Sequence, residues 1–184
     1  VSDAGTLKRI DYSLIKGGVD GWSSSSGNLL PADASKGIYL GVNSATAANL
    51  LDDYEEGTFT PTWSFSSGSV TYQHQSGRYT KIGRTVTATI QINTAGVSSA
   101  SGNATLNGLP FACDKEHACS IGTFYRWNTN FDNQIVARVD EGNATIQLFH
   151  GAANGSEPDY IQGNDFLTGS AKNITSLAIT YQTA

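Results

Sequence analysis

The densest group of reactive side chains is the acidic run of residues 52–57 (DDYEEG), which places four carboxylates around one tyrosine. Such a run could bind a cation or supply the paired acids of a glycoside hydrolase. A calcium loop needs oxygen ligands at alternating positions around a glycine turn, and this spacing is absent. Paired catalytic acids must face each other across a substrate, which neighbours in sequence do not. We therefore expect a solvated acidic turn that pairs with Arg78, Lys81 or Arg84 of its own or a neighbouring chain.

The second group consists of Cys113 and Cys119, with His117 between them. A zinc site would need a fourth ligand and tighter spacing, so we expect no metal. The sequence is compatible both with a disulfide that closes a short loop and with two free thiols. The remaining histidines, His74 and His150, fall at the ends of expected strands, and no nucleophile elbow, phosphate loop or dinucleotide fingerprint occurs. We expect neither an enzyme nor a cofactor.

The third group lies in two loops, residues 126–133 and 151–164, which combine aromatic rings with amides and carboxylates. A sugar presents apolar C–H faces and a rim of hydroxyls, so its site needs flat rings and planar polar groups. In the alternative, Trp127 and Phe131 plug the end of the fold and the polar residues form Asx turns. We favour Trp127 as a stacking platform. The candidate ligand-binding residues are Trp127, Asn128, Asn130, Asp132, Asp159 and Tyr160.

These loops need a scaffold, and the chain predicts one made of strands. Phe59, Pro61, Trp63 and Phe65 alternate with polar residues, as do Val86, Ala88, Ile90 and Ile92 further along. Pro61 cannot donate to a ladder, so we place its strand at an edge or a bulge. We expect turns at residues 66–69 and 75–77 and a loop over residues 93–103.

The alternation recurs in many short segments after residue 37, with no helical periodicity longer than two turns and no repeat of fixed period. This predicts an all-β fold, an antiparallel β-sandwich of jelly-roll type, over residues 37–184. Residues 1–36 are less regular and are expected to form a connector. Leu7, Ile10 and Leu14 have the spacing of one or two helical turns there, either packed with other copies or lying on their own domain.

Several phrases of the chain resemble a module at the distal end of bacteriophage tail fibres and tailspikes. The resemblance lies in residues 51–62 (LDDYEEGTFTPT) and 76–83 (SGRYTKIG), and further pieces at 37–41, 106–111, 146–149 and 179–181 are similar. It covers roughly residues 37–184, and its motifs mark a scaffold rather than a chemistry. The resemblance implies a homotrimeric receptor-binding tip of the virion, assembled in the host cytoplasm and acting at the bacterial cell surface.

Composition limits the classes of molecule that this chain is expected to bind. The 184 residues carry 11 basic and 16 acidic side chains, a net charge of −5, and no basic stripe that would suit nucleic acid. No apolar run approaches the length of a membrane span. We therefore expect a non-enzymatic tip that binds a bacterial surface glycan, lipopolysaccharide or capsule, with avidity from three copies. The alternatives are a ligand-free trimerisation or folding domain of a larger fibre or depolymerase, and a carbohydrate-active enzyme or its accessory module.

Overall fold

The computed structural model describes residues 22–26, 28–31, 35–128, 135–150, 159–170 and 172–183. The chain divides into two compact units, Val1–Asp53 and Tyr54–Ala184. The expected division after residue 36 stays a prediction. The expected helical stripe of Leu7, Ile10 and Leu14 lies outside the described residues.

The first unit contains two small antiparallel ribbons. None of its described side chains is buried, and Ile38 is 53% exposed. A two-stranded ribbon has no second layer against which its apolar side chains could pack. The elements are β1 (Trp22–Ser25) paired with β2 (Asn28–Pro31), then β3 (Ile38–Tyr39), the 3-10 turn η1 (Ala47–Asn49), and β4 (Leu50–Leu51), which pairs with β3.

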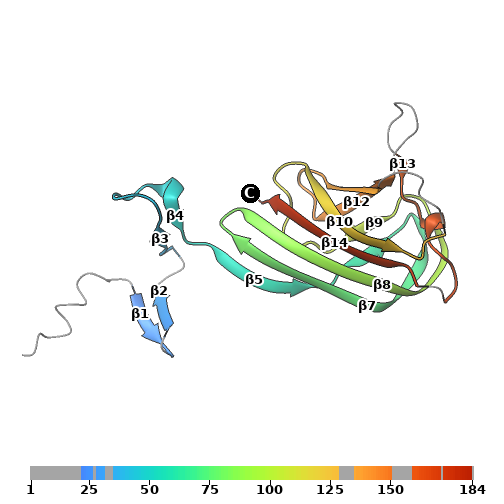
Figure 1. The fold of residues 1–184 in the computed structure, drawn as a ribbon, viewed down its shortest axis with the longest axis horizontal. Coiled ribbons are helices and arrows are strands. Elements are labelled where there is room, and N and C mark those ends of the chain that lie inside the picture. The colour runs from blue at the N-terminus through green and yellow to red at the C-terminus, as the bar shows by residue number, and fades with distance from the viewer. Residues whose placement is uncertain are drawn as a thin grey trace, which may run out of the picture. The chain divides into compact units, whose positions relative to one another are not determined.

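The second unit is an antiparallel β-sandwich, which confirms the predicted fold class (Figure 1). Its elements in chain order are β5 (Tyr54–Phe59), β6 (Thr62–Ser64), β7 (Ser67–Ile82), β8 (Thr85–Ser101), β9 (Thr105–Asn107), β10 (His117–Tyr125), β11 (Ile135–Val139), β12 (Thr145–His150), β13 (Asp159–Tyr160), the 3-10 turn η2 (Gly163–Asp165) and β14 (Ile174–Gln182).

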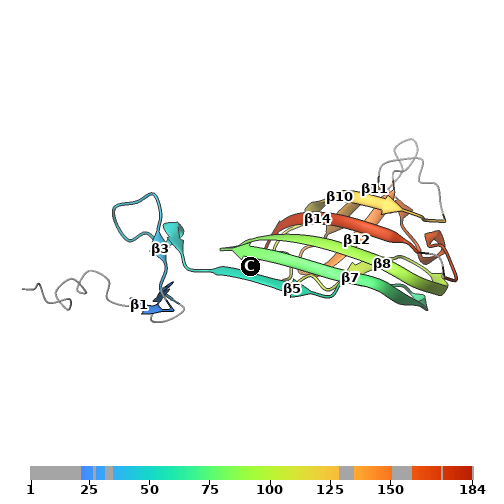
Figure 2. The same ribbon diagram turned by 60° about the horizontal axis from the view of Figure 1, so that its bottom comes forward.

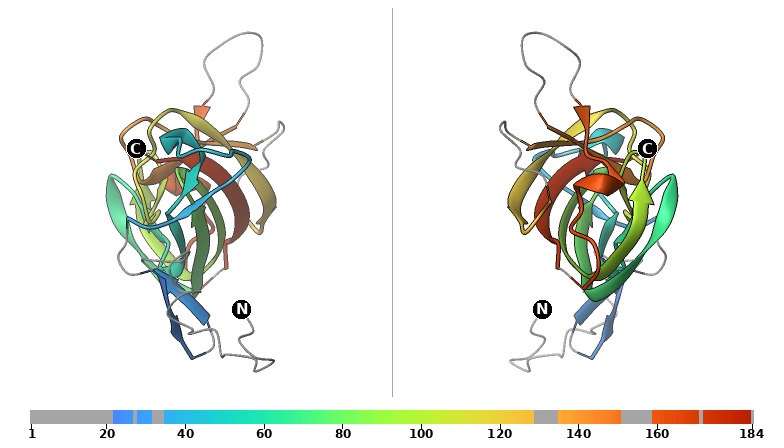
Figure 3. Two further views of the ribbon diagram at one scale, coloured as in Figure 1. Left: turned by 90° about the vertical axis from the view of Figure 1, so that its left-hand side faces the viewer. Right: turned by 90° about the vertical axis from the view of Figure 1, so that its right-hand side faces the viewer.

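The sandwich has two sheets that share one strand. The first sheet has the order β5-β7-β8-β14-β10, and the second has the order β10-β11-β12-β9-β6, with β13 also on β12. Strand β10 pairs with β11 through residues 117–119 and with β14 through residues 120–125. Figures 2 and 3 show the resulting two layers, with β7, β8 and β14 on one side and β12 on the other.

The core lies between the two layers and follows the predicted alternation. Val86, Ala88, Ile90 and Ile92 of β8 are all buried, whereas the threonines between them are exposed. From the second sheet, alternate residues of β12 and β11 meet them. Trp63, one of the alternating apolar residues of segment 59–65, is buried as well.

The predicted turns at 66–69 and 75–77 and the predicted loop at 93–103 are wrong. Strand β7 runs without a break from Ser67 to Ile82, and β8 runs from Thr85 to Ser101. The two strands form one long hairpin with register shifts at Ser67, Thr71 and Tyr72. Small polar residues in these segments suggest turns, yet pairing over the full hairpin satisfies their backbone groups within the ladder.

At two glycines in the first sheet, an aromatic ring from the neighbouring strand occupies the space where a side chain would lie. Gly57 of β5 is in register with Tyr79, and Phe59 is in register with Gly77 of β7. A Cβ on Gly57 would lie 2.6 Å from the Tyr79 ring, and one on Gly77 would lie 2.6 Å from the Phe59 ring. Each ring therefore occupies the space above a glycine, which fixes the register of the edge strand.

Pro61 lies where the chain passes from one sheet to the other. Strand β5 forms the edge of the first sheet, and β6 forms the edge of the second sheet after Thr60 and Pro61. Proline has no N–H to donate, so a break between two edge strands is a position that it tolerates. The expectation of an edge or bulge position for Pro61 agrees with this topology.

Candidate functional site

The acidic run does not form the expected turn. Tyr54 to Gly57 belong to β5, where Glu55 is in register with Lys81 and Glu56 with Thr80. The hydroxyl of Tyr54 donates to Glu56 and that of Tyr79 donates to Glu55. These hydrogen bonds raise the pKa of both tyrosines. The carboxylates thus line a sheet edge, and a charged edge discourages pairing with further strands.

No metal-binding cluster occurs among the described residues: no three side chains of His, Cys, Asp or Glu come together there. Cys113 is a buried free thiol whose Sγ contacts the carbonyl oxygen of Lys115. Burial raises the pKa of the Cys113 thiol, which makes it a poor nucleophile. The side chains of His117 and Cys119 lie outside the description. Within the described chain no helix is both long and apolar enough to cross a membrane.

Trp127 packs into an aromatic cluster at one end of the core. Its ring centroid lies 4.1 Å from that of Phe166, 4.7 Å from Phe124 and 5.9 Å from Trp63. The indole is half-buried. This packing is what the end-plug alternative describes, and a ligand contact of Trp127 stays a prediction.

Asn128 ties the same end of the sandwich to the turn η2. Its backbone N–H donates to the carbonyl of Asp165 at 2.8 Å, and its side-chain amide donates to the carbonyl of Asn164 at 3.3 Å. The side chain is exposed. The other two candidates of this loop, Asn130 and Asp132, lie outside the described residues.

Asp159 and Tyr160 form β13, which pairs with the end of β12 in the second sheet. Tyr160 is in register with Phe149 of β12, and their ring centroids are 4.6 Å apart. Phe149 points away from the core, because Ile146 and Leu148 occupy the inward positions of β12. The Phe149 ring is nevertheless buried. Tyr160 covers one side of it, and the guanidinium of Arg138, on β11, lies 4.9 Å from its centroid.

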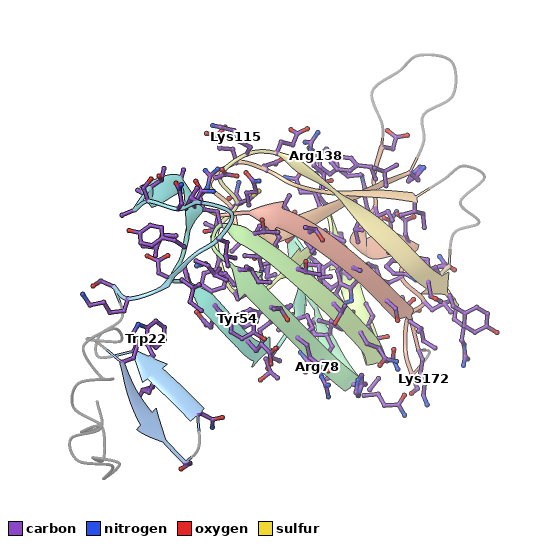
Figure 4. All side chains as sticks on the ribbon, turned by 60° about the vertical axis from the view of Figure 1, so that its left-hand side comes forward. Trp22, Tyr54, Arg78, Lys115, Arg138 and Lys172 are labelled. Atoms are coloured by element: carbon purple, nitrogen blue, oxygen red, sulfur yellow. The ribbon has the colours of Figure 1, made fainter. Side chains whose placement is uncertain are left out.

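A network of polar groups fixes this guanidinium. Arg138 Nε lies 2.8 Å from Asp140 and 3.7 Å from Glu116, and Nη2 donates to Gln147 at 3.4 Å. The Gln147 amide in turn donates to Asp140 at 2.7 Å. We name Val136, Arg138, Gln147, Phe149 and Tyr160 the outer patch. Figure 4 shows Arg138 on this side of the sandwich, together with Lys115.

The outer patch has the chemistry of a saccharide subsite. Tyr160 and Val136 offer apolar surface for C–H groups, and Val136 is 44% exposed. Arg138 and Gln147 offer donors and acceptors for hydroxyls, whereas Asp159, the strand neighbour of Tyr160, points to the opposite face of the sheet. The sequence singles out Asp159 and Tyr160 as candidates, and their role in binding stays a prediction; it does not single out Arg138, Gln147 or Phe149. The available signal was the run Leu148-Phe149, where two large apolar residues in succession must point to opposite faces of a strand.

The two predicted loops begin and end at one end of the sandwich. Ile135 of β11 is in register with His150 of β12, which is in register with Asp159 of β13. Tyr125, the last residue of β10, is in register with Ile174, at the start of β14. The opposite end holds Tyr54 and the turn after Ile82. The ends of both loops thus lie at the end of the sandwich remote from Tyr54, although Trp127 and Tyr160 pack on different surfaces there.

No protein-family model matches the chain, and no curated protein matches it either. Among solved structures, the crystal structure of the Dettilon tailspike protein has a similar fold, with a TM-score of 0.55 over 68% of this chain at 18% identity. The chain spans 23% of the length of that tailspike chain. The likeness is one of fold: about two thirds of this chain is similar to part of a phage tailspike.

Proposed function

We propose that this chain is a tip domain of a phage tail fibre or tailspike and attaches the virion to carbohydrate of the bacterial surface as a homotrimer. The observation that carries the proposal is the similarity of its fold to part of a phage tailspike. The phrases of residues 51–62 and 76–83 point to the same class of protein. The domain would be a component of the virion that binds its glycan without cleaving it.

The proposed attachment uses the loop-bearing end of the sandwich. A sugar ring would stack on Tyr160, whose own ring rests on Phe149 and is therefore held in place. Gln147 and the ion-paired Arg138 would bond hydroxyls at the rim. Asp140 and Glu116 neutralise Arg138, so a neutral surface glycan suits the site better than an acidic one. Each such site is weak, and three copies in one tip supply avidity.

The ligand-free alternative has one observation in its favour, namely the packing of Trp127 against Phe166 and Trp63. A ring held in a core cluster contributes to stability whether or not a ligand exists. In that case the domain would serve assembly alone, and the glycan site would belong to another part of a larger fibre.

The test is glycan-array binding by the full chain, followed by titration of the best glycan with Tyr160→Ala. We expect this variant to lose about tenfold or more in affinity per site while its circular dichroism still shows a folded sandwich. Tyr39→Ala, which removes an exposed tyrosine from the first unit, is the matched control and should bind like the native chain. Absence of any glycan binding would support the assembly domain, and release of reducing ends from bacterial polysaccharide would overturn the non-enzymatic role.

A further inference from the structure

We propose that the outer face of the first sheet is the surface through which copies of this chain meet; this inference rests on the homotrimer of the proposed function. We define the outer face by the alternate residues of β5, β7, β8 and β14 that point away from the core, together with Tyr125 of β10. Figure 1 looks onto β7, β8 and β14 and shows no other element of residues 54–183 covering them.

The centre of this face is flat and consists of small polar side chains. Thr87 is in register with Thr80 on one side and Thr180 on the other, and Thr89 is in register with Arg78 and Ala178. The hydroxyls of Thr87 and Thr180 lie 3.2 Å apart. Such side chains have few rotamers to immobilise, so covering them costs little conformational entropy.

The corners of the face carry exposed apolar and aromatic side chains. Among the described residues of the sandwich, the exposed large apolar side chains are Tyr54 (61%), Ile82 (51%), Tyr125 (62%) and Val136 (44%). Tyr54 and Ile82 are cross-strand neighbours at one corner, and Tyr125 lies at the far end beside β14. Three of the four thus lie on one face, and exposed tyrosines are typical anchors of protein interfaces.

Charge is sparse on this face and complementary. Only Glu56 and Arg78 are charged among its described side chains, and Arg78 forms no ion pair with any described residue. A shallow depression of about 370 Å³ lies around these two residues and Thr58 and Thr80. The carboxylate of one copy can therefore face the guanidinium of the next, and a protruding side chain can enter the depression. Figure 4 shows Tyr54 and Arg78 on this face, opposite Arg138.

The size of the face suits a copy of the chain. Five strands spaced about 4.8 Å apart, with β14 nine residues long, give about 600 Å² of flat area before side-chain relief is counted. A standard interface takes about 800 Å² from each partner. A closed three-fold ring has heterologous contacts, so one part of this face on each copy would meet a different part of the face on the next copy.

The experiment measures the mass of the full chain by light scattering at micromolar concentration, for the native sequence and for Ala178→Arg. Ala178 is exposed near the centre of the face and its methyl makes no polar contact, so the arginine is tolerated in an isolated copy. In the trimer it would bury an unpaired charge, and we expect about a hundredfold weaker association. The matched control is Val136→Arg, an exposed strand position on the second sheet.

Each result decides one of the two proposals. A native trimer, a folded monomeric Ala178→Arg and a trimeric Val136→Arg would support the assigned face. A native trimer that survives Ala178→Arg would overturn the face and leave the proposed assembly intact, and so would dissociation by Val136→Arg alone. A native mass of 19.4 kDa would overturn the proposed trimer itself. Circular dichroism with thermal unfolding separates a monomeric variant from a misfolded one.

Discussion

The ribbons of residues 22–53 and the sandwich of residues 54–183 both contain strands with large apolar side chains, but these side chains are exposed in the ribbons and buried in the sandwich. Val86 and Ile92 in the sandwich are fully buried, whereas Ile38, Tyr39 and Leu40 in the β3 region are exposed. Both regions pair their strands, so hydrogen bonding does not separate them. The difference lies in the second layer, which the sandwich has and the described ribbons lack.

This difference teaches where the stability of the described chain resides. A ladder of two short strands leaves apolar surface in water and gains little from the hydrophobic effect. In the sandwich, the inward side chains of β8 belong to one core cluster and are at most 8% exposed. Substitutions in the sandwich core should therefore have large effects on unfolding, and comparable substitutions in the ribbons should have small ones.

The largest effect is expected for Trp63→Ala. The Trp63 ring is buried and packs edge-on against Phe166 at 5.1 Å, and its backbone N–H donates to the Tyr72 hydroxyl at 2.7 Å. Removing the ring leaves a cavity, which should lower the free energy of unfolding by about 3–5 kcal/mol. Chemical denaturation measures this. An unchanged midpoint would show that the second layer does not seal the core and would break the comparison.

A smaller effect is expected for Gly77→Ala in β7. The added methyl would meet the Phe59 ring, which fills the space above this glycine. Displacing the ring should cost about 1–3 kcal/mol in the free energy of unfolding. Ser76→Ala, one residue earlier and on the opposite face, is the matched control and should change little. Equal effects of the two substitutions would argue against the interlock of β5 and β7.

A pH-dependent effect sharpens the comparison at the core. Burial raises the pKa of Tyr181 to about 12. In the unfolded chain a tyrosine has a pKa of about 10, so the unfolded state loses this proton first. The contribution of Tyr181 to the free energy of unfolding should be complete below about pH 10 and should be lost as the pH rises toward 12. Urea unfolding across this range should show a shallower decline for Tyr181→Phe, and an identical decline would contradict the assignment.

The smallest effect is expected for Ile38→Ser in the β3 ribbon. The side chain is already exposed and the two units are separately compact, so sandwich unfolding should change by no more than about 0.5 kcal/mol. Near-ultraviolet circular dichroism of the buried aromatic residues reports the sandwich alone. A loss of more than about 1 kcal/mol would mean that the ribbons support the sandwich.

The sequence predicted those parts of the fold in which local pattern and tertiary environment agree. The alternation of apolar and polar residues predicted the part of β8 from Val86 to Ile92 and the inward side of the segment that contains Trp63. It failed at Gly77, read as a turn residue, because the ring that makes a glycine favourable there comes from a different strand. It also failed at Asn93 and beyond, where pairing with β7 overrides the loop-like composition.

The candidate site was predictable only in part for a related reason. Tyr160 stands out in its loop because an aromatic ring among polar residues is unusual. Phe149 and Arg138 do not stand out, since a phenylalanine and an arginine in strands have ordinary structural explanations. Only the register of β11, β12 and β13 places these three side chains together. Pairing between distant strands is set by the whole fold and leaves little trace in local composition.

The central position of β14 has a consequence for how the chain is made. This strand, residues 174–182, lies between β8 and β10 in the first sheet. During synthesis on the ribosome, β8 and β10 emerge well before it and each presents an open edge until it arrives. The first sheet is therefore complete only after residue 182 has been added. A nascent chain that stalls earlier exposes the unpaired edges of β8 and β10, which can pair with strands of neighbouring chains.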